Sequence, residues 1–198
     1  LSVSGSLTAT AGTVTFVGTS TLSGTANLFN VTLNGTSLQL GATSILGIAG
    51  AFTLTSGTFD VTTTAPNTVN YNGSGAQTIA TTYSNLTLSG GGTKTAGAAL
   101  TINNDLTIGS GVTFDPSSFT HTLYGNWINN GSFTAGSSTI QMLGSADVSI
   151  TGATTFNILT IDKDNALNVV TLDNDISTAT LNMTNGKILT GSNKVTVT

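Results

Sequence analysis

The chain lacks Cys, Arg and Glu, and it carries few charges of either sign. Its 198 residues contain four Lys, eight Asp and one His, which gives a net charge of −4. Without Cys there is no disulfide scaffold and no thiolate metal site. Four scattered Lys make no basic patch for a phosphate backbone, so no nucleic-acid partner is expected. No apolar run approaches the length of a membrane span, so none is expected here.

Helix formers such as Glu, Arg and Gln are absent or rare, whereas Thr, Ser, Asn and Gly are abundant between Val, Ile, Leu and Phe. Such β-branched and small polar residues are favoured on pleated surfaces. With 38% hydrophobic residues and little net charge, the chain can bury a core and should fold. The composition therefore predicts an all-β protein with almost no helix.

The chain repeats itself unevenly. Three similar blocks, each with apolar residues two apart followed by Gly, lie at Thr13–Gly18, Thr68–Gly73 and Thr139–Gly144. The second interval between blocks is clearly longer than the first. Such self-similarity is typical of stacked repeats. We expect a single β-solenoid domain over residues 1–198, with imperfect repeats near 13–67, 68–138 and 139–198.

Between these blocks run short, closely spaced alternating segments, such as Phe52–Leu54 and Leu106–Ile108. Alternation punctuated by Gly, Asn or Asp indicates short strands with one face inward. Three such strands with bends make a coil of about 20 residues, within the range of stacked repeat units. This pattern predicts a right-handed parallel β-helix. An antiparallel β-sandwich, which also has many short strands, is the alternative.

Three phrases resemble the Thr/Asn/Gly-rich repeat regions of large bacterial cell-surface proteins, a group regarded as β-helical and adhesin-like. They are Val69–Ile79, Tyr83–Leu88 and Gly125–Phe133. The resemblance implies export, repetition and a surface role. It transfers no catalytic residue and no ligand, because a shared fold does not carry a function.

An enzyme is not expected, although parallel β-helices also host polysaccharide-active enzymes. Glycoside hydrolysis normally needs two carboxylates flanking the bond, and most of the eight Asp lie in turns, where Asp caps its own backbone. A lyase base is commonly Arg or Lys, and the chain has no Arg. His121 is the only His and has no recognisable nucleophile partner, so it is interpreted as a polar residue at a strand edge.

Two sets of residues are weaker candidates for binding sites. Asp162, Asp164, Asp173 and Asp175 form the densest acidic clusters and could hold calcium, but neither calcium-loop spacing is present, so no cofactor is expected. Trp127, with Tyr124 nearby, could contact a ligand such as a glycan, although a single Trp is more often buried. Irregular Thr-x-Thr ladders leave an ice-binding protein as a remote alternative.

Both ends of the chain, at residues 1–4 and 194–198, have strand-like sequences with no evident cap. Unpaired ends of a solenoid must be covered or joined to another chain. We therefore expect a structural extracellular module on a bacterial cell surface, which self-associates end to end or continues within a longer chain. An adhesin module that binds a glycan or another surface is the alternative.

Overall fold

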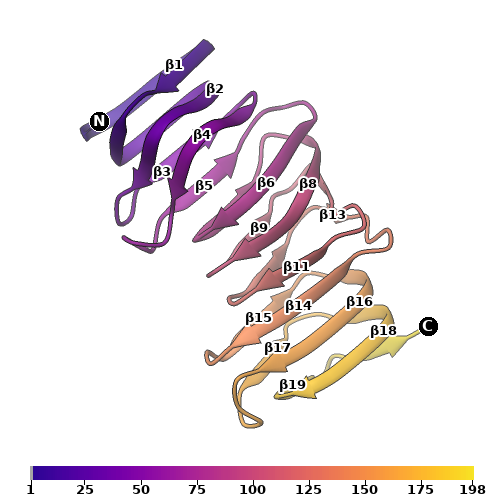
Figure 1. The fold of residues 1–198 in the computed structure, drawn as a ribbon. Helices are drawn as coiled ribbons and strands as arrows, with labels where there is room; N and C mark the ends of the chain where they lie inside the picture. Colours follow the sequence, from indigo (N-terminus) through magenta and orange to yellow (C-terminus); the bar gives the residue numbers. More distant parts are fainter. Residues whose placement is uncertain (1) are drawn as a thin grey trace.

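The computed structural model describes residues 2–198, and it leaves the side chains of 2–5 and 80 aside. Leu1, the first residue of the strand-like N-terminal segment, lies outside this description. The described chain is all-β and winds into a parallel β-solenoid of about 10 turns (Figure 1). The predicted solenoid is thereby confirmed. The sandwich is excluded, because every strand pair in the described residues is parallel.

The strands form two long sheets. The 11-stranded sheet contains β1 (Ser2–Phe16), β2 (Thr19–Leu40), β3 (Ile45–Ile48), β4 (Phe52–Asp60), β5 (Thr68–Tyr71), β7 (Asn85–Leu88), β9 (Leu106–Ile108), β12 (Trp127–Asn129), β15 (Val148–Thr151), β17 (Val169–Leu172) and β19 (Lys187–Leu189). The 9-stranded sheet contains β6 (Gln77–Tyr83), β8 (Gly92–Ile102), β10 (Val112–Asp115), β11 (Thr120–Leu123), β13 (Ser132–Phe133), β14 (Thr139–Gly144), β16 (Thr154–Lys163), β18 (Ile176–Asn185) and β20 (Val195–Val197).

Some coils hold three short strands, as the spacing of the alternating runs predicts, whereas in others one long strand covers two of the three faces. One coil contains β9, β10 and β11 in sequence, and the next contains β12, β13 and β14. Two of the three faces belong to one sheet, because long strands such as β8 pair with β10 at one end and with β11 at the other. Coil length varies along the stack. Ile45 pairs with Thr68 of the following coil, and Thr68 pairs with Asn85 of the coil after that; the second pair is closer in sequence than the first.

The coils, and not the three sequence blocks, are the units of hydrogen bonding. Val69 of the second block lies on β5 in the 11-stranded sheet, whereas Ile140 of the third block lies on β14 in the 9-stranded sheet. Similar phrases therefore occupy different faces of the coil. The interval from one block to the next spans two or more coils and ends on a different face, which explains why the intervals are uneven although the coils vary much less in length.

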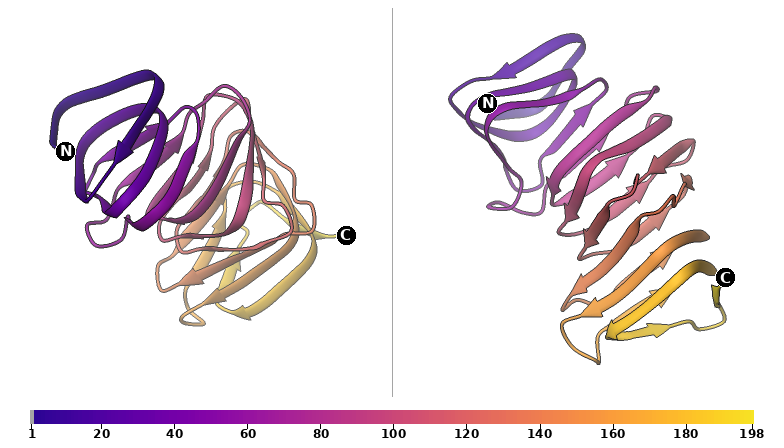
Figure 2. Two further views of the ribbon diagram at one scale, coloured as in Figure 1. Left: turned by 45° about the horizontal axis from the view of Figure 1, so that its top comes forward. Right: turned by 45° about the vertical axis from the view of Figure 1, so that its right-hand side comes forward.

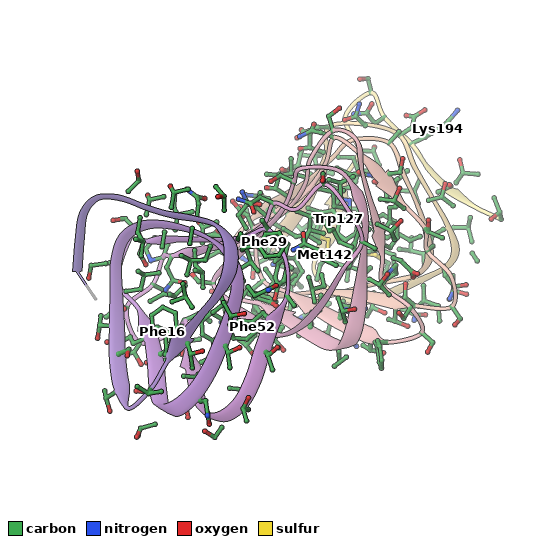
Figure 3. The ribbon with its side chains drawn as sticks, turned by 90° about the horizontal axis from the view of Figure 1, so that it is seen from above. Phe16, Phe29, Phe52, Trp127, Met142 and Lys194 are labelled. Carbon is green, nitrogen blue, oxygen red and sulfur yellow. The ribbon has the colours of Figure 1, made fainter. Side chains whose placement is uncertain are left out.

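The core is a column of stacked apolar side chains inside the tube. Val69, Leu86, Leu106 and Trp127 follow one another through the strand register, and each is at least 98% buried. Alternate residues point outward, as in the half-buried, buried pattern of β5 and β7. Burying one large aliphatic side chain stabilises the fold by about 1.5–3 kcal/mol. Each added coil buries further such side chains and therefore adds to the stability of the core. Figure 3 shows Trp127 and Met142 inside the tube and Lys194 outside it.

The stack is interrupted on one side. The pairing β2–β3–β5–β7 continues without a break, but β4 pairs only with β2, and β6 pairs only with β8. Within residues 2–198 no backbone ladder joins β4 to β6. The first coils, in indigo and violet, are therefore connected to the later ones mainly through one face (Figure 2).

Candidate functional site

A corner of the solenoid carries a ladder of Asn and Asp side chains. The backbone N–H of Asp105 donates to Oδ1 of Asn85 (3.2 Å), and that of Asn126 donates to Oδ1 of Asp105 (2.8 Å). The N–H of Ser149 in turn donates to Oδ1 of Asn126 (2.8 Å). One coil higher, Oδ1 of Asp147 accepts from Val169 N–H (2.8 Å). Each side-chain oxygen thus accepts a hydrogen bond from a backbone N–H of the next coil, at the corner where the backbone ladder between strands ends.

This ladder corrects part of the sequence interpretation. Asp60 and Asp115 do cap their own turns, through Thr62 and Ser117 respectively. Asp105 and Asp147, by contrast, bond to the following coil. The signal was present as Asn or Asp recurring at positions 85, 105, 126 and 147. It was missed because Asn is frequent throughout the chain.

A groove opens on the outside of this corner. Its volume is about 440 Å³, and it is lined by Asn103, Asn104, Asp105, Tyr124, Gly125, Asn126, Gly144, Ser145, Ala146, Asp147, Val148 and Asp164. Tyr124 is 37% exposed. Its ring lies against Gly144, where a Cβ atom would come within 2.9 Å of Tyr124 Cδ1. The missing side chain at Gly144, which also has a φ of +85°, leaves room for the ring.

The groove is acidic at its rim and has a buried cation nearby. Asp105, Asp147 and Asp164 contribute three carboxylates. Lys163, 1% exposed, donates from Nζ to the carbonyl oxygen of Leu143. Burial lowers the pKa of Lys163, while Asp164 and Asp147 act in the opposite direction. An exposed aromatic ring among amide and carboxylate groups can stack on and hydrogen-bond to a polar ring such as a sugar.

Trp127 is not part of this groove. It is completely buried, with its ring 4.9 Å from Phe133 and 5.1 Å from Phe156, centroid to centroid. Its Nε1–H donates to Oγ1 of Thr154 (3.2 Å). Trp127 and Tyr124 therefore point to opposite sides of the wall, and only Tyr124 is available to a ligand.

The four calcium candidates occupy two different corners. Asp162 and Asp164 lie at the end of β16, whereas Asp173 and Asp175 lie between β17 and β18. Asp173 accepts from Oγ1 of Thr151 (2.7 Å), and Asp175 lies 3.7 Å from Nζ of Lys194. Among the residues whose side chains are described, no group of three or more His, Asp or Glu side chains could hold a metal ion.

His121 is inside the solenoid and not at a strand edge, which corrects its interpretation. It is 3% exposed; Nδ1 accepts from Leu100 N–H (3.1 Å) and Nε2 lies 2.9 Å from the carbonyl oxygen of Pro116. A carbonyl only accepts, so Nε2 carries the proton and the ring is neutral. Burial lowers the pKa of His121, and the hydrogen bond to Pro116 opposes this only in part. Its Nδ1 takes the place of a backbone carbonyl as the acceptor for Leu100 N–H, and its ring packs edge-on against Phe114 and Phe119.

We compared the chain with known proteins. No family model, curated protein or solved structure matches it. The resemblance to bacterial surface repeats stays a prediction that depends on the quoted phrases. Residues 2–198 also include no helix that is long and apolar enough to cross a membrane.

Proposed function

We propose that the chain is a structural module of an extracellular surface or filament, built from stacked β-coils and extended by further coils or by another copy. The proposal assigns it no catalytic role. The observation that supports it is the uncovered last coil, where apolar side chains in core register face solvent.

Met183 is the clearest of these side chains. It pairs with Ile161, which pairs with Met142, and both of those are fully buried, yet Met183 is 46% exposed. Val197 pairs with the buried Thr178 and is 59% exposed. These positions continue the core column, and no coil within residues 2–198 covers them.

The backbone at this end is also open. Strands β19 and β20 each pair on one side only, and Leu181–Asn185 of β18 has no strand beyond it in the described chain. At the other end β1 pairs only with β2. Because all the strands run in parallel, the open edge at one end of the stack can pair with the open edge at the other end of a second copy. Such head-to-tail stacking does not close and therefore produces fibres.

Association with concentration tests this proposal. Sedimentation velocity and negative-stain microscopy should show oligomers or fibres that grow as the protein is concentrated. Met183→Lys places a charge in the stacked core and should suppress them at least tenfold. Thr196→Lys, an exposed position on β20, should not. A protein that stays monomeric, with Met183→Lys indistinguishable from the parent, would contradict end-to-end assembly.

The surface location needs its own measurement. In cells that express the natural gene, an antibody against the folded chain should label intact, unpermeabilised cells or the medium. Labelling only after permeabilisation would refute an extracellular role without affecting the assembly result.

The Tyr124 groove favours a second candidate, an adhesin module that binds a glycan. A glycan array should give hits that Tyr124→Ala abolishes and Tyr124→Phe retains. Leu167→Ala provides a control, because Leu167 is 71% exposed but lies outside the groove. Array binding that survives Tyr124→Ala would remove this candidate.

A further inference from the structure

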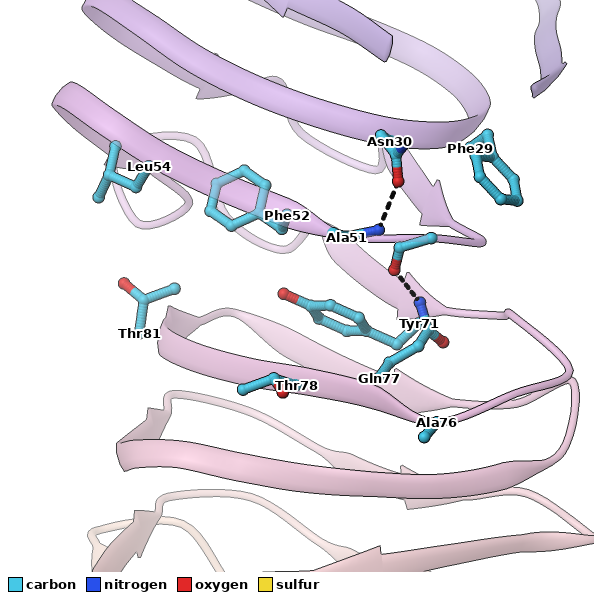
Figure 4. Close-up of a pocket in the computed structure, with 11 residues that line it drawn as sticks. Phe29, Asn30, Ala51, Phe52, Leu54, Tyr71, Ala76, Gln77, Thr78 and Thr81 are labelled. Carbon is cyan, nitrogen blue, oxygen red and sulfur yellow. Dashed lines mark hydrogen bonds between the residues drawn. The ribbon is translucent and has the colours of Figure 1, made fainter. Parts of the chain in front are cut away.

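The break between β4 and β6 forms a cleft on the side of the solenoid. Its volume is about 600 Å³, within the range of ligand-binding clefts. The lining residues are all uncharged: Phe29, Asn30, Gly50, Ala51, Phe52, Leu54, Tyr71, Ala76, Gln77, Thr78 and Thr81. Figure 4 shows Phe52 and Leu54 on one rim, Thr78 and Thr81 on the other, and the Tyr71 ring between them.

The rim on β4 exposes a side chain that belongs to the core. Leu54 pairs with Leu33 on the preceding coil, and Leu33 is fully buried while Leu54 is 46% exposed. Leu33 has a strand neighbour on both sides, Phe16 and Leu54, whereas in residues 2–198 Leu54 pairs with Leu33 alone. Each residue from Thr53 to Thr58 is exposed, so the strand lacks a neighbour along most of its length.

Aromatic pairs close the core on both sides of the cleft. Phe52 and Phe59 lie 4.8 Å apart, centroid to centroid, at the last coil before the break. Tyr71 and Tyr83 form an edge-to-face pair after it, with their hydroxyl oxygens 3.0 Å apart. These aromatic pairs flank an apolar slot, while the core stays continuous behind it, where the buried Leu46 of β3 pairs with Val69 of β5.

Gln77 bridges one end of the slot. Its Nε2 donates to the carbonyl oxygens of Ile48 (2.9 Å) and Gly50 (2.6 Å). Its Oε1 accepts from Gly73 N–H (3.0 Å) and from Nζ of the buried Lys94 (2.6 Å). This side chain makes the connections between coils that a backbone ladder makes elsewhere, and β4 and β6 diverge beyond it.

We propose that the slot receives one extended, uncharged segment of a partner polypeptide, which adds a strand between β4 and β6. Two facing strand edges present N–H and C=O groups at the strand repeat of about 3.3 Å per residue, and a peptide backbone can match both edges. The segment runs parallel to β4 and β6, as all other neighbours in the solenoid do.

The lining specifies the chemistry of this segment. Apolar residues at alternate positions cover Phe52 and Leu54, and small polar residues between them face solvent with Thr78. Charged side chains on the inner positions are disfavoured, because the slot offers no counter-ion and burial removes their hydration. The nine residues of β4 and the seven of β6 limit the segment to about seven residues at one strand position each.

The test uses a labelled peptide with the uncharged sequence of residues 139–145 of this chain, which alternates Ile140 and Met142 with polar residues. Fluorescence anisotropy should show saturable binding. A peptide N-methylated at alternate backbone nitrogens keeps the side chains and loses donors, and it should bind at least tenfold more weakly. Equal binding of the two peptides would show an apolar ligand cleft without strand addition and would overturn the proposal.

Two protein variants locate the binding. Leu54→Lys puts a charge into the slot and should weaken peptide binding at least tenfold. Thr53→Lys, the outward-facing neighbour on the same strand, should leave binding within twofold. Circular dichroism of both variants establishes that they fold. Similar binding by both, or no binding by the parent, would refute the slot.

Hydrogen exchange distinguishes the other occupants. Bound peptide should slow amide exchange in β4 and β6. Protection in β18–β20 instead would place the peptide at the open end of the stack and refute the proposal. Protection of β4 and β6 that increases with protein concentration in the absence of peptide would identify a second copy as the occupant, which also overturns it.

Discussion

The corner ladder of Asn and Asp should be a measurable source of stability, and Asn126 is the position to test. Asn126 occupies the middle of the ladder: it accepts from Ser149 N–H and donates from Nδ2 to Oδ1 of Asp105 (2.9 Å). Replacement by Ala removes both bonds, together with a longer and weaker one from Ser149 Oγ (3.4 Å), and leaves the half-buried Ser149 N–H without its acceptor.

The magnitude follows from these two bonds. A neutral hydrogen bond contributes about 0.5–1.5 kcal/mol and one to a charged group about 1.5–3 kcal/mol. Because the corner is partly solvent-exposed, water recovers part of the loss. We expect Asn126→Ala to lower the free energy of unfolding by about 2 kcal/mol.

Urea unfolding followed by circular dichroism measures this change. Asn130→Ala is the matched control, because Asn130 is exposed and lies outside the ladder, and surface substitutions usually change stability by less than about 0.5 kcal/mol. If both variants unfold at the same urea concentration as the parent, with unchanged urea dependence, the ladder does not stabilise the solenoid and the reasoning is refuted.

Three further predictions concern buried side chains. Trp127→Ala should cost about 3–5 kcal/mol, because it empties a packed aromatic site; a loss below about 1 kcal/mol in the same urea assay would contradict this. The lowered pKa of His121 means that the unfolded chain binds its proton first, so the free energy of unfolding should fall as pH decreases from 7 to 5, by at most about 1.4 kcal/mol per pH unit. His121→Gln should flatten this dependence, and an unchanged slope would rule out His121 as its source. Lys94→Met removes the donor to the backbone oxygens of Gly73 and Gly75 and one of two donors to Gln77 Oε1, and it should cost about 2 kcal/mol, whereas the exposed Lys187→Met should cost almost nothing; equal midpoints for the two would dismiss the Lys94 network.

Much of the fold could be predicted from local pattern. Alternation of the kind seen in Leu106-Thr107-Ile108 specifies an inward face, and the coil length follows from the spacing of such runs. Trp127-Ile128-Asn129 shows the limit: either apolar residue could face inward. The register decides, because Trp127 stacks on Leu106 of the previous coil and Ile128 on Thr107.

The binding surfaces could not be predicted in this way. Phe52-Thr53-Leu54 has the same alternation as strands that are fully buried, so nothing local marks it as the rim of a slot. Its exposure depends on β6, a full coil later in the chain, diverging from β4 where Gln77 replaces the ladder. Likewise Tyr124 and Asp147 line the same groove only because successive corners stack, and their separation in sequence hides that arrangement.

The missing ladder between β4 and β6 also has a mechanical consequence. Tension along the solenoid axis is carried across most levels by backbone ladders around the whole circumference. At this level the β3–β5 ladder and the Gln77 side chain carry it. We therefore expect a molecule pulled along its axis to open first at the level between β4 and β6. This would release the early coils as one block while the remainder stays folded.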